Sequence, residues 1–295
     1  MKVAHELYPF ESHWLDRGGL KYHYLDEGAG DPVVMIHGNP SWSFYYRNLA
    51  LALRDRYRVI VPDHIGCGYS DKPGDDRYEY TLKSRVDDLE ALLDALKLTA
   101  KLTLVVHDWG GMIGLAYADR HPERIARLVV MNTAAFRMPA TKKLPWQLAL
   151  GRNTTTGSLL IRGFNAFARG TADIACTRHP MSRELKAAYC APYDSWANRI
   201  ATLRFVQDIP LTPADKAYAI VAGVEERLHQ FRSVPTLICW GDKDIVFDDP
   251  FLAEWQRQLP QASVHRFPDC GHYVLEDNAE EIIPLVKSFL ERTTT

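Results

Sequence analysis

The strongest constraint on the fold is a regular alternation between short apolar runs and longer amphipathic stretches. The apolar runs lie at residues 33–36, 58–61, 102–106 and 126–131. Runs of this length and composition are typical of parallel strands that are buried on both faces. The amphipathic stretches have apolar residues at helical spacing and lie at residues 45–54, 82–96 and 112–120. Strands that alternate with helices predict an α/β chain with a mostly parallel, doubly wound sheet.

Two departures from this alternation predict the domain organisation. Residues 11–28 alternate around a glycine pair, which indicates an antiparallel hairpin. From about residue 133 to about residue 224 the sequence is irregular, aromatic and rich in proline, which indicates an inserted helical cap. The strand pattern then returns at 236–240 and 263–267, followed by a helical stretch at 279–291. We therefore expect a first core segment at 1–132, a cap at 133–224 and a second core segment at 225–295.

The composition excludes several classes of protein. The chain has 46% hydrophobic and 24% charged residues and a formal net charge of -2, as in ordinary soluble proteins. Its basic residues are spread among the acidic ones, so we expect no nucleic-acid partner. No stretch approaches the roughly 18 apolar residues of a membrane span, and residues 1–10 do not resemble a signal peptide. We therefore expect a cytoplasmic protein.

Cysteines and histidines give no sign of a disulfide framework or a metal site. The five cysteines are odd in number and widely separated, as expected for reduced thiols. No two histidines have a metal-ligand spacing and no CxxC motif occurs, so we expect neither a metal nor a cofactor.

The motif His107-Asp108-Trp109-Gly110-Gly111 follows the apolar run at 102–106 and precedes a helical stretch. A sharp strand-to-helix turn with a small residue two places after its centre is a nucleophile elbow, which raises the central side chain above the sheet. The central residue is Asp108. A carboxylate attacks carbon without first losing a proton and forms an ester that can later be cleaved. The motif therefore predicts a carboxylate nucleophile rather than a helix-capping aspartate.

A base and a supporting acid are expected at the same edge of the sheet. His272 follows the last apolar run and precedes the final helix, where it can face the elbow. Asp242 and Asp244 follow the run at 236–240, and either carboxylate could orient the histidine. We expect the acid to be Asp244, with Asp242 as the alternative.

Two further residues are candidates for stabilising negative charge. Asn39 lies in the turn His37-Gly38-Asn39-Pro40, directly after the run at 33–36. Its amide, together with the indole N–H of Trp109, offers two neutral donors to an anionic leaving group.

These residues resemble the haloalkane dehalogenase branch of the α/β-hydrolase superfamily. The resemblance rests on the HGNP turn, the loop at 62–71 and the HDWGG elbow, and it covers essentially the whole core. It implies an α/β-hydrolase fold. In that family the elbow aspartate is the nucleophile, the late histidine activates water, and the HGNP asparagine and the elbow tryptophan cradle the halide. By position these roles fall on Asp108, His272, Asn39 and Trp109.

A more specific resemblance, at residues 63–70 and 80–93, is to the β-lactone decarboxylases of bacterial long-chain olefin biosynthesis. It implies decarboxylation of a cis-3,4-dialkyl β-lactone to a cis-alkene and carbon dioxide. It also implies a small alkyl substrate and an assembly with other enzymes of olefin biosynthesis.

Three other functions stay open. Hydrolytic dehalogenation of an alkyl halide would use the same residues. Epoxide hydrolases share the elbow but need two cap tyrosines, for which the candidates are Tyr189, Tyr193 and Tyr218. A ligand-binding member of the fold is the non-enzymatic alternative. The cap also offers aromatic side chains for an apolar pocket wall, namely Phe136, Trp146, Phe164, Phe167, Trp196 and Phe205.

Overall fold

The computed structural model describes residues 3–293, and the sheet within this range has eight strands in the order β1-β2-β4-β3-β5-β6-β7-β8. Strands β1 and β2 form the expected hairpin and pair antiparallel, β2 also pairs antiparallel with β4, and the other neighbours are parallel. The strands are β1 (His13–Asp16), β2 (Lys21–Glu27), β3 (Pro32–Ile36), β4 (Arg58–Pro62), β5 (Leu102–Asp108), β6 (Ile125–Thr133), β7 (Thr236–Gly241) and β8 (Ser263–Phe267).

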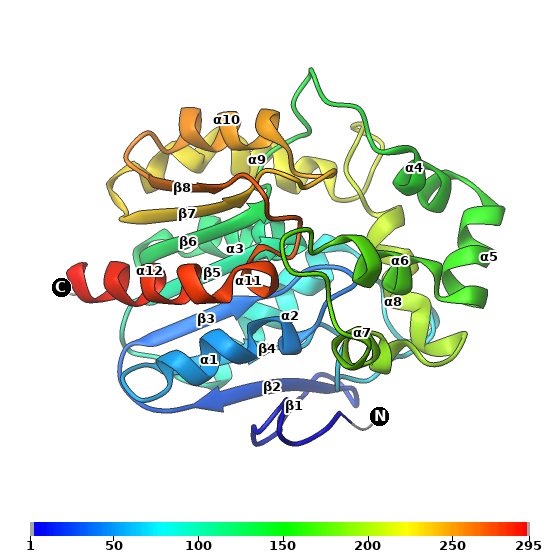
Figure 1. The fold of residues 1–295 in the computed structure, drawn as a ribbon, viewed down its shortest axis with the longest axis horizontal. Coiled ribbons are helices and arrows are strands. Elements are labelled where there is room, and N and C mark those ends of the chain that lie inside the picture. Colours follow the sequence, from blue (N-terminus) through cyan, green and yellow to red (C-terminus); the bar gives the residue numbers. More distant parts are fainter. Residues whose placement is uncertain (1–2, 294–295) are drawn as a thin grey trace.

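Helices cover both faces of this sheet (Figure 1). Helices α1, α11 and α12 lie on the face toward the viewer, and α2, α3, α9 and α10 lie behind it. Their bounds are α1 (Arg47–Leu53), α2 (Leu82–Ala95), α3 (Trp109–Arg120), α9 (Tyr218–Arg227), α10 (Asp249–Gln258), α11 (Val274–Asp277) and α12 (Ala279–Arg292). Short 3-10 helices are η1 (Ser43–Tyr46), η2 (Pro122–Arg124), η3 (Ala191–Tyr193), η4 (Ala197–Arg199) and η5 (Leu228–Ser233).

Between β6 and β7 the chain leaves the sheet and forms a layer of helices beyond the carboxyl ends of the strands (Figure 1). These cap helices are α4 (Trp146–Asn153), α5 (Thr155–Phe164), α6 (Ala166–Ile174), α7 (Arg183–Cys190) and α8 (Ile200–Gln207). Helix α9, which contains the expected end of the cap at residue 224, packs against α3 of the core. We propose 133–224 as the cap, and the outermost residues 1–2 and 294–295 of the expected core segments lie outside the described range.

The central strands are buried on both faces, which explains their continuous apolar sequence. On β3, Val34 and Ile36 belong to the core beneath α2 and α3, whereas Val33 and Met35 belong to the core beneath α1 and α12. The expectation of a mostly parallel, doubly wound α/β sheet is therefore confirmed. No helix in the described part of the chain is long and apolar enough to cross a bilayer.

Helix α3 begins earlier than expected, at Trp109 instead of Met112. The sequence pattern placed Gly110 and Gly111 in a turn, but both lie in the first turn of the helix. A Cβ on Gly110 would lie 1.9 Å from the carbonyl oxygen of Ile36, and one on Gly111 would lie 2.0 Å from Thr133 Oγ1. The glycines therefore let the start of α3 approach the neighbouring strands, and this holds the elbow close to the sheet.

Candidate active site

Asp108 ends β5 and has a backbone conformation that few residues other than glycine adopt. Its φ is 51° and its ψ is -127°, and its side chain makes no capping hydrogen bond to α3. The alternative role as a helix cap is therefore not supported. A backbone held in such a conformation is typical of a nucleophile elbow, which lifts the central side chain over the carboxyl edge of the sheet.

The turn after β3 wraps closely around the Asp108 carboxylate. The backbone N–H of Asn39 donates to Asp108 Oδ1 at 2.6 Å. A Cβ on Gly38 would lie 2.0 Å from the same oxygen, so only glycine leaves room for it. Burial raises the pKa of Asp108, while His272 and the backbone N–H groups of Asn39 and Trp109 oppose this rise. The net shift is upward, so the environment makes the carboxylate more basic than an exposed one.

His272 lies between two carboxylates. Its Nδ1 is 2.7 Å from Asp244 Oδ2, and its Nε2 is 3.6 Å from Asp108 Oδ2. The short contact places the Nδ1 proton on the side of Asp244, which leaves Nε2 facing the nucleophile. Burial disfavours the imidazolium, but Asp244 and then Asp108 outweigh it and raise the pKa of His272. The histidine is thus placed to accept a proton beside Asp108.

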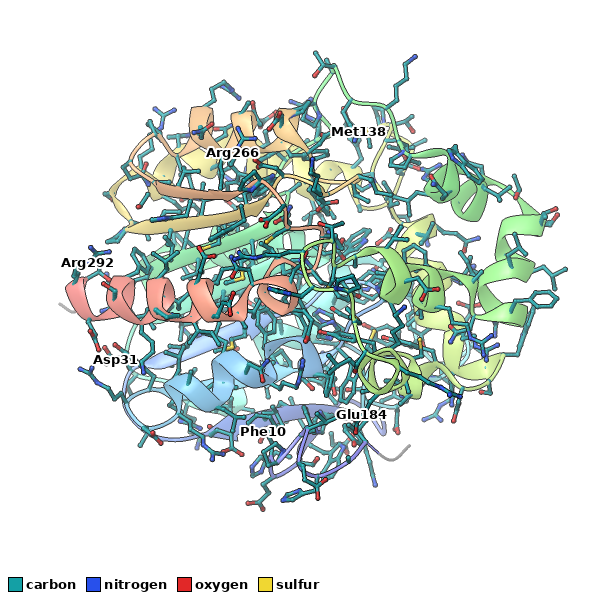
Figure 2. The ribbon with its side chains drawn as sticks, viewed as in Figure 1. Phe10, Asp31, Met138, Glu184, Arg266 and Arg292 are labelled. Atoms are coloured by element: carbon teal, nitrogen blue, oxygen red, sulfur yellow. The ribbon has the colours of Figure 1, made fainter. Side chains whose placement is uncertain are left out.

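The two candidate acids have different surroundings. Asp244 is buried, and besides His272 it accepts hydrogen bonds from the amide of Asn132 at 3.1 Å and from the backbone N–H of Val246 at 2.7 Å. Asp242 instead forms an ion pair at 2.9 Å with Arg266, which lies on the edge strand β8 and is labelled in Figure 2. The structure therefore brings Asp244, and not Asp242, to the histidine.

Sequence analysis missed two residues that hold this arrangement. The Asn132 side chain donates to the carbonyl of Gly241 at 2.9 Å and accepts from its N–H at 2.8 Å, which fixes the loop that carries Asp244. His107 contacts the carbonyl oxygen of His272 through Nε2 at 2.8 Å. A polar residue at the end of the apolar run at 126–131 was the available signal for Asn132, because the carboxyl ends of parallel strands gather active-site residues.

The two expected donors, Asn39 and Trp109, both face the cavity above Asp108 and both contact α8 of the cap. One N–H of the Asn39 amide donates to the carbonyl oxygen of Thr202 at 3.1 Å. The ring of Phe205 packs edge-on against Trp109, with 5.3 Å between centroids. The cap therefore positions both side chains that we expect to bind negative charge.

A cavity of about 580 Å³ lies between the cap and the carboxyl ends of the strands, and Asp108, His272, Asn39 and Trp109 form its floor. Most of the other lining residues are apolar. Met138, labelled in Figure 2 on the loop between β6 and α4, is one of them. A large apolar cavity with a few converging polar groups is typical of a site for an alkyl substrate.

Only two of the six expected cap aromatics line this cavity, namely Phe136 and Phe167. Phe205 is buried behind Trp109. The other three are exposed at the protein surface: Trp146 by 70%, Phe164 by 64% and Trp196 by 50%. The expected pocket wall is therefore right for two residues and wrong for these three, because irregular cap helices give no periodicity from which to tell inward from outward faces.

Comparison with known proteins agrees with this geometry. The sequence profile described as the alpha/beta hydrolase fold matches residues 31–279. The chain belongs to this family. The haloalkane dehalogenase DbeA from Bradyrhizobium elkani has a similar structure, with a TM-score of 0.86 and 26% identity over 96% of this chain and 98% of that one. The expected resemblance to the dehalogenase branch is confirmed.

Two curated relatives of this α/β-hydrolase are much more similar in sequence. The cis-3-alkyl-4-alkyloxetan-2-one decarboxylase of Shewanella oneidensis is 58% identical over 98% of this chain and 91% of its own length. The enzyme of the same name from Xanthomonas campestris pv. campestris is 51% identical over 97% of each chain. An alkyloxetan-2-one is a β-lactone, so the more specific resemblance is also confirmed.

The tyrosines that an epoxide hydrolase would need do not face the site of this α/β-hydrolase. The hydroxyl of Tyr189 donates to Glu276 at 2.7 Å, and that of Tyr193 donates to the carbonyl oxygen of Ser41 at 3.0 Å. Neither they nor Tyr218 line the cavity within the described residues. The epoxide hydrolase alternative thus loses the feature that supported it.

Among the described residues, the cavity lining also includes the amine of Lys243. Within residues 3–293 no three histidine, cysteine, aspartate or glutamate side chains are arranged to hold a metal ion. The five cysteines are free thiols, and four of them are buried. The charged or titratable side chains in the cavity lining are Asp108, Asp244, His272 and Lys243.

Proposed function

We propose that this enzyme decarboxylates cis-3-alkyl-4-alkyloxetan-2-ones to cis-alkenes and carbon dioxide, as a carbon–carbon lyase of olefin biosynthesis. The observation that carries the proposal is the 58% and 51% identity to two decarboxylases of that name over nearly the whole chain. The buried carboxylate of Asp108 beneath an apolar cavity supports it independently.

In the first step, Asp108 attacks the ring carbon that bears the ring oxygen. A carbon–oxygen bond forms to Asp108, the ring carbon–oxygen bond breaks, and the strained ring opens to a free carboxylate. This carbon is inverted. The donors Asn39 and Trp109 face the space above Asp108, where the new carboxylate would form, and they would stabilise its charge.

In the second step, the carbon–carbon bond to the new carboxylate breaks and its electron pair forms the alkene. The carbon–oxygen bond to Asp108 breaks at the same time, which restores the carboxylate and releases carbon dioxide. If the two groups leave anti to each other, inversion followed by anti departure gives a net syn elimination. A cis-lactone then yields a cis-alkene without consuming water. Attack at the lactone carbonyl is a second route to ring opening.

The other charged groups of the site would adjust the pKa of Asp108. His272, which is 3.6 Å from Asp108, lowers the pKa of this carboxyl group and thereby opposes the effect of burial. Asp244 holds the His272 ring in a fixed orientation through the 2.7 Å contact to Nδ1. On an alkyl halide the same histidine would instead activate water against the Asp108 ester.

Product analysis with a synthetic cis-dialkyl β-lactone tests the proposal. We expect cis-alkene and carbon dioxide in equal amounts, and no halide from a panel of haloalkanes. Halide release without conversion of the lactone would make the enzyme a dehalogenase, and diols from epoxides would make it an epoxide hydrolase. Binding of the lactone without turnover or a covalent adduct would make the protein a ligand-binding member of the family.

We also propose that the enzyme is cytoplasmic and works in an assembly with other enzymes of olefin biosynthesis. Five free cysteines support a reducing compartment. A dialkyl lactone is poorly soluble in water, so direct transfer from the enzyme that forms it would be favoured. Fractionation of native cells followed by size measurement tests both points, since a cytosolic protein of monomeric size in the presence of those enzymes would contradict the assembly.

A further inference from the structure

The cap exposes several large apolar side chains. Six of the eight large hydrophobic side chains that are exposed among residues 3–293 belong to the cap segment 133–224. Helix α5 carries three of them, with Leu159 exposed by 52%, Leu160 by 36% and Phe164 by 64%. In Figure 1 this helix lies at the end of the molecule opposite the C-terminus, with no other element outside it. Large exposed apolar patches are characteristic of interaction sites.

A fourth exposed residue, Trp196, extends the patch beyond α5. A Cβ on Gly163 would lie 3.4 Å from the Leu159 side chain and 3.8 Å from the Trp196 ring, so these two side chains flank the glycine. The inward side of α5 is packed, because Gly157 and Ile161 are buried. Leu159, Leu160, Phe164 and Trp196 do not line the catalytic cavity. We call Leu159, Leu160, Phe164 and Trp196 the cap face.

The cap segment carries an excess of positive charge, and two of its arginines, Arg162 and Arg199, lie beside the cap face. The segment 133–224 contains twelve arginine and lysine residues and five aspartate and glutamate residues, a formal charge of +7, although the whole chain carries -2. The Arg162 guanidinium lies 4.6 Å from the centre of the Trp196 ring, and Arg199 donates to the carbonyl oxygens of Arg162 and Gly163. Within the described residues, five cap cations form no ion pair with an acidic side chain, namely Lys143, Arg162, Arg169, Arg183 and Arg199.

We propose that the cap face binds the surface of an anionic lipid bilayer. Exposed aromatic and aliphatic side chains enter the interface between headgroups and acyl chains, while neighbouring arginines bind the lipid phosphates. A second copy of the chain would match the apolar surface but would bring Arg162 and Arg199 of both copies together, and this like-charge contact disfavours it. The bilayer is complementary to the face in both respects. Binding there is peripheral, and it also brings the enzyme to the phase into which an alkyl substrate partitions.

Vesicle sedimentation tests the proposal without measuring catalysis. We expect the wild-type protein to sediment with vesicles of phosphatidylcholine and phosphatidylglycerol, to be released by salt, and to bind vesicles of phosphatidylcholine alone much more weakly. The double variant Phe164→Ser, Trp196→Ser should lose most of this binding. The charge variant Arg162→Gln, Arg169→Gln should reduce the partition coefficient roughly tenfold or more, because each cation near an anionic surface contributes separately.

Matched controls come from other parts of the molecule. Trp14 on β1 is exposed by 49%, and Lys101 is an exposed lysine outside the cap that forms no ion pair within residues 3–293, so Trp14→Ser and Lys101→Gln should bind like the wild type. All cap-face variants should turn over detergent-solubilised lactone at the wild-type rate. Equal loss of binding in the controls, or no wild-type binding to anionic vesicles, would overturn the proposal. A dimer that Phe164→Ser dissociates, without vesicle binding, would assign the face to self-association instead.

Discussion

The ring of His107 donates a hydrogen bond from Nε2 to the carbonyl oxygen of His272, across 2.8 Å. Because a carbonyl only accepts, this contact fixes the His107 proton on Nε2. Burial lowers the pKa of His107, and the neighbouring His272 lowers it further. The residue before the nucleophile is therefore a neutral donor that holds the backbone of the base, and it adds no charge beside the His272 ring.

Replacement of His107 should separate this positioning role from simple packing. In His107→Phe the carbonyl oxygen of His272 loses its buried partner, which should lower the free energy of unfolding by about 1–3 kcal/mol. We expect kcat to fall while KM changes little, since the cavity is unaltered. His107→Gln retains an N–H near the position of Nε2 and should recover much of kcat. Equal activity of the Phe variant and the wild type would show that the contact does not position the base.

The contrast between Asp244 and Asp242 gives a second prediction. Asp244→Asn removes the charge that holds the His272 imidazolium and should lower turnover without preventing folding. Asp242→Asn removes only a partly exposed ion pair with Arg266 and should leave turnover and stability nearly unchanged. Steady-state kinetics and thermal unfolding of both variants provide the comparison. Normal turnover in Asp244→Asn would move the supporting role to another residue.

The choice between these two aspartates illustrates where the sequence was insufficient. Both follow the run at 236–240 within four positions, and nothing local distinguishes them. The tertiary structure distinguishes them. Arg266 on β8 pairs with Asp242, whereas Asn132 on β6 donates a hydrogen bond to Asp244 and holds it toward His272. Asp108 and His272 were predictable because a local motif and the strand order alone place them at one edge of the sheet.

The cap was less predictable than the core for a related reason. The buried faces of the core strands can be recognised in the sequence because these strands are continuous apolar runs. The cap helices are short and interrupted by prolines, so their buried faces leave no such pattern. Trp146, Phe164 and Trp196 therefore resembled pocket residues in sequence but lie exposed in the structure. The contacts of Thr202 and Phe205 with the two expected donors depend on how α8 docks on the core, which no local pattern encodes.

The donors themselves give a third prediction. Asn39→Ala or Trp109→Phe removes one N–H from the space where negative charge develops. Each change should cost roughly 2 to 4 kcal/mol of transition-state stabilisation if the anion is fully desolvated. Single-turnover rates on the cis-lactone measure this cost. An unchanged rate in both variants would mean that the departing charge lies elsewhere in the cavity.

The acid limb of the pH–rate profile gives a fourth prediction. Attack requires ionised Asp108, so kcat/KM should fall as the pH drops through its pKa, which burial raises above the ordinary value of 3.8. His272 opposes that rise by favouring the carboxylate. In His272→Gln this influence is lost, the pKa of Asp108 rises further, and the acid limb should move to higher pH. The control Asp242→Asn should leave the acid limb of the profile at its wild-type pH. An acid limb that does not move in His272→Gln would contradict the electrostatic coupling between His272 and Asp108.

The fifth prediction concerns Asp108 and His272, whose replacements should fail at different stages. Asp108→Asn lacks the nucleophilic carboxylate, so no covalent adduct should form with any substrate. His272→Ala retains the carboxylate, so on a haloalkane the ester should form and accumulate for want of activated water. Intact-mass spectra after incubation distinguish the two outcomes. An adduct that forms on Asp108→Asn and disappears when a different residue is changed would refute the nucleophile assignment.

The same pair of variants distinguishes the two chemistries on a β-lactone. Decarboxylation as proposed consumes no water and regenerates Asp108 directly. If it also needs no base, His272→Ala should retain substantial alkene formation above its shifted acid limb. If a step needs water or a proton from the histidine, the variant should instead stall as an adduct whose mass exceeds that of the protein by the whole lactone. An adduct whose mass is that of the lactone adduct less one carbon dioxide would mean that the variant stalls after the carbon–carbon bond has broken. These masses report the step that each residue serves.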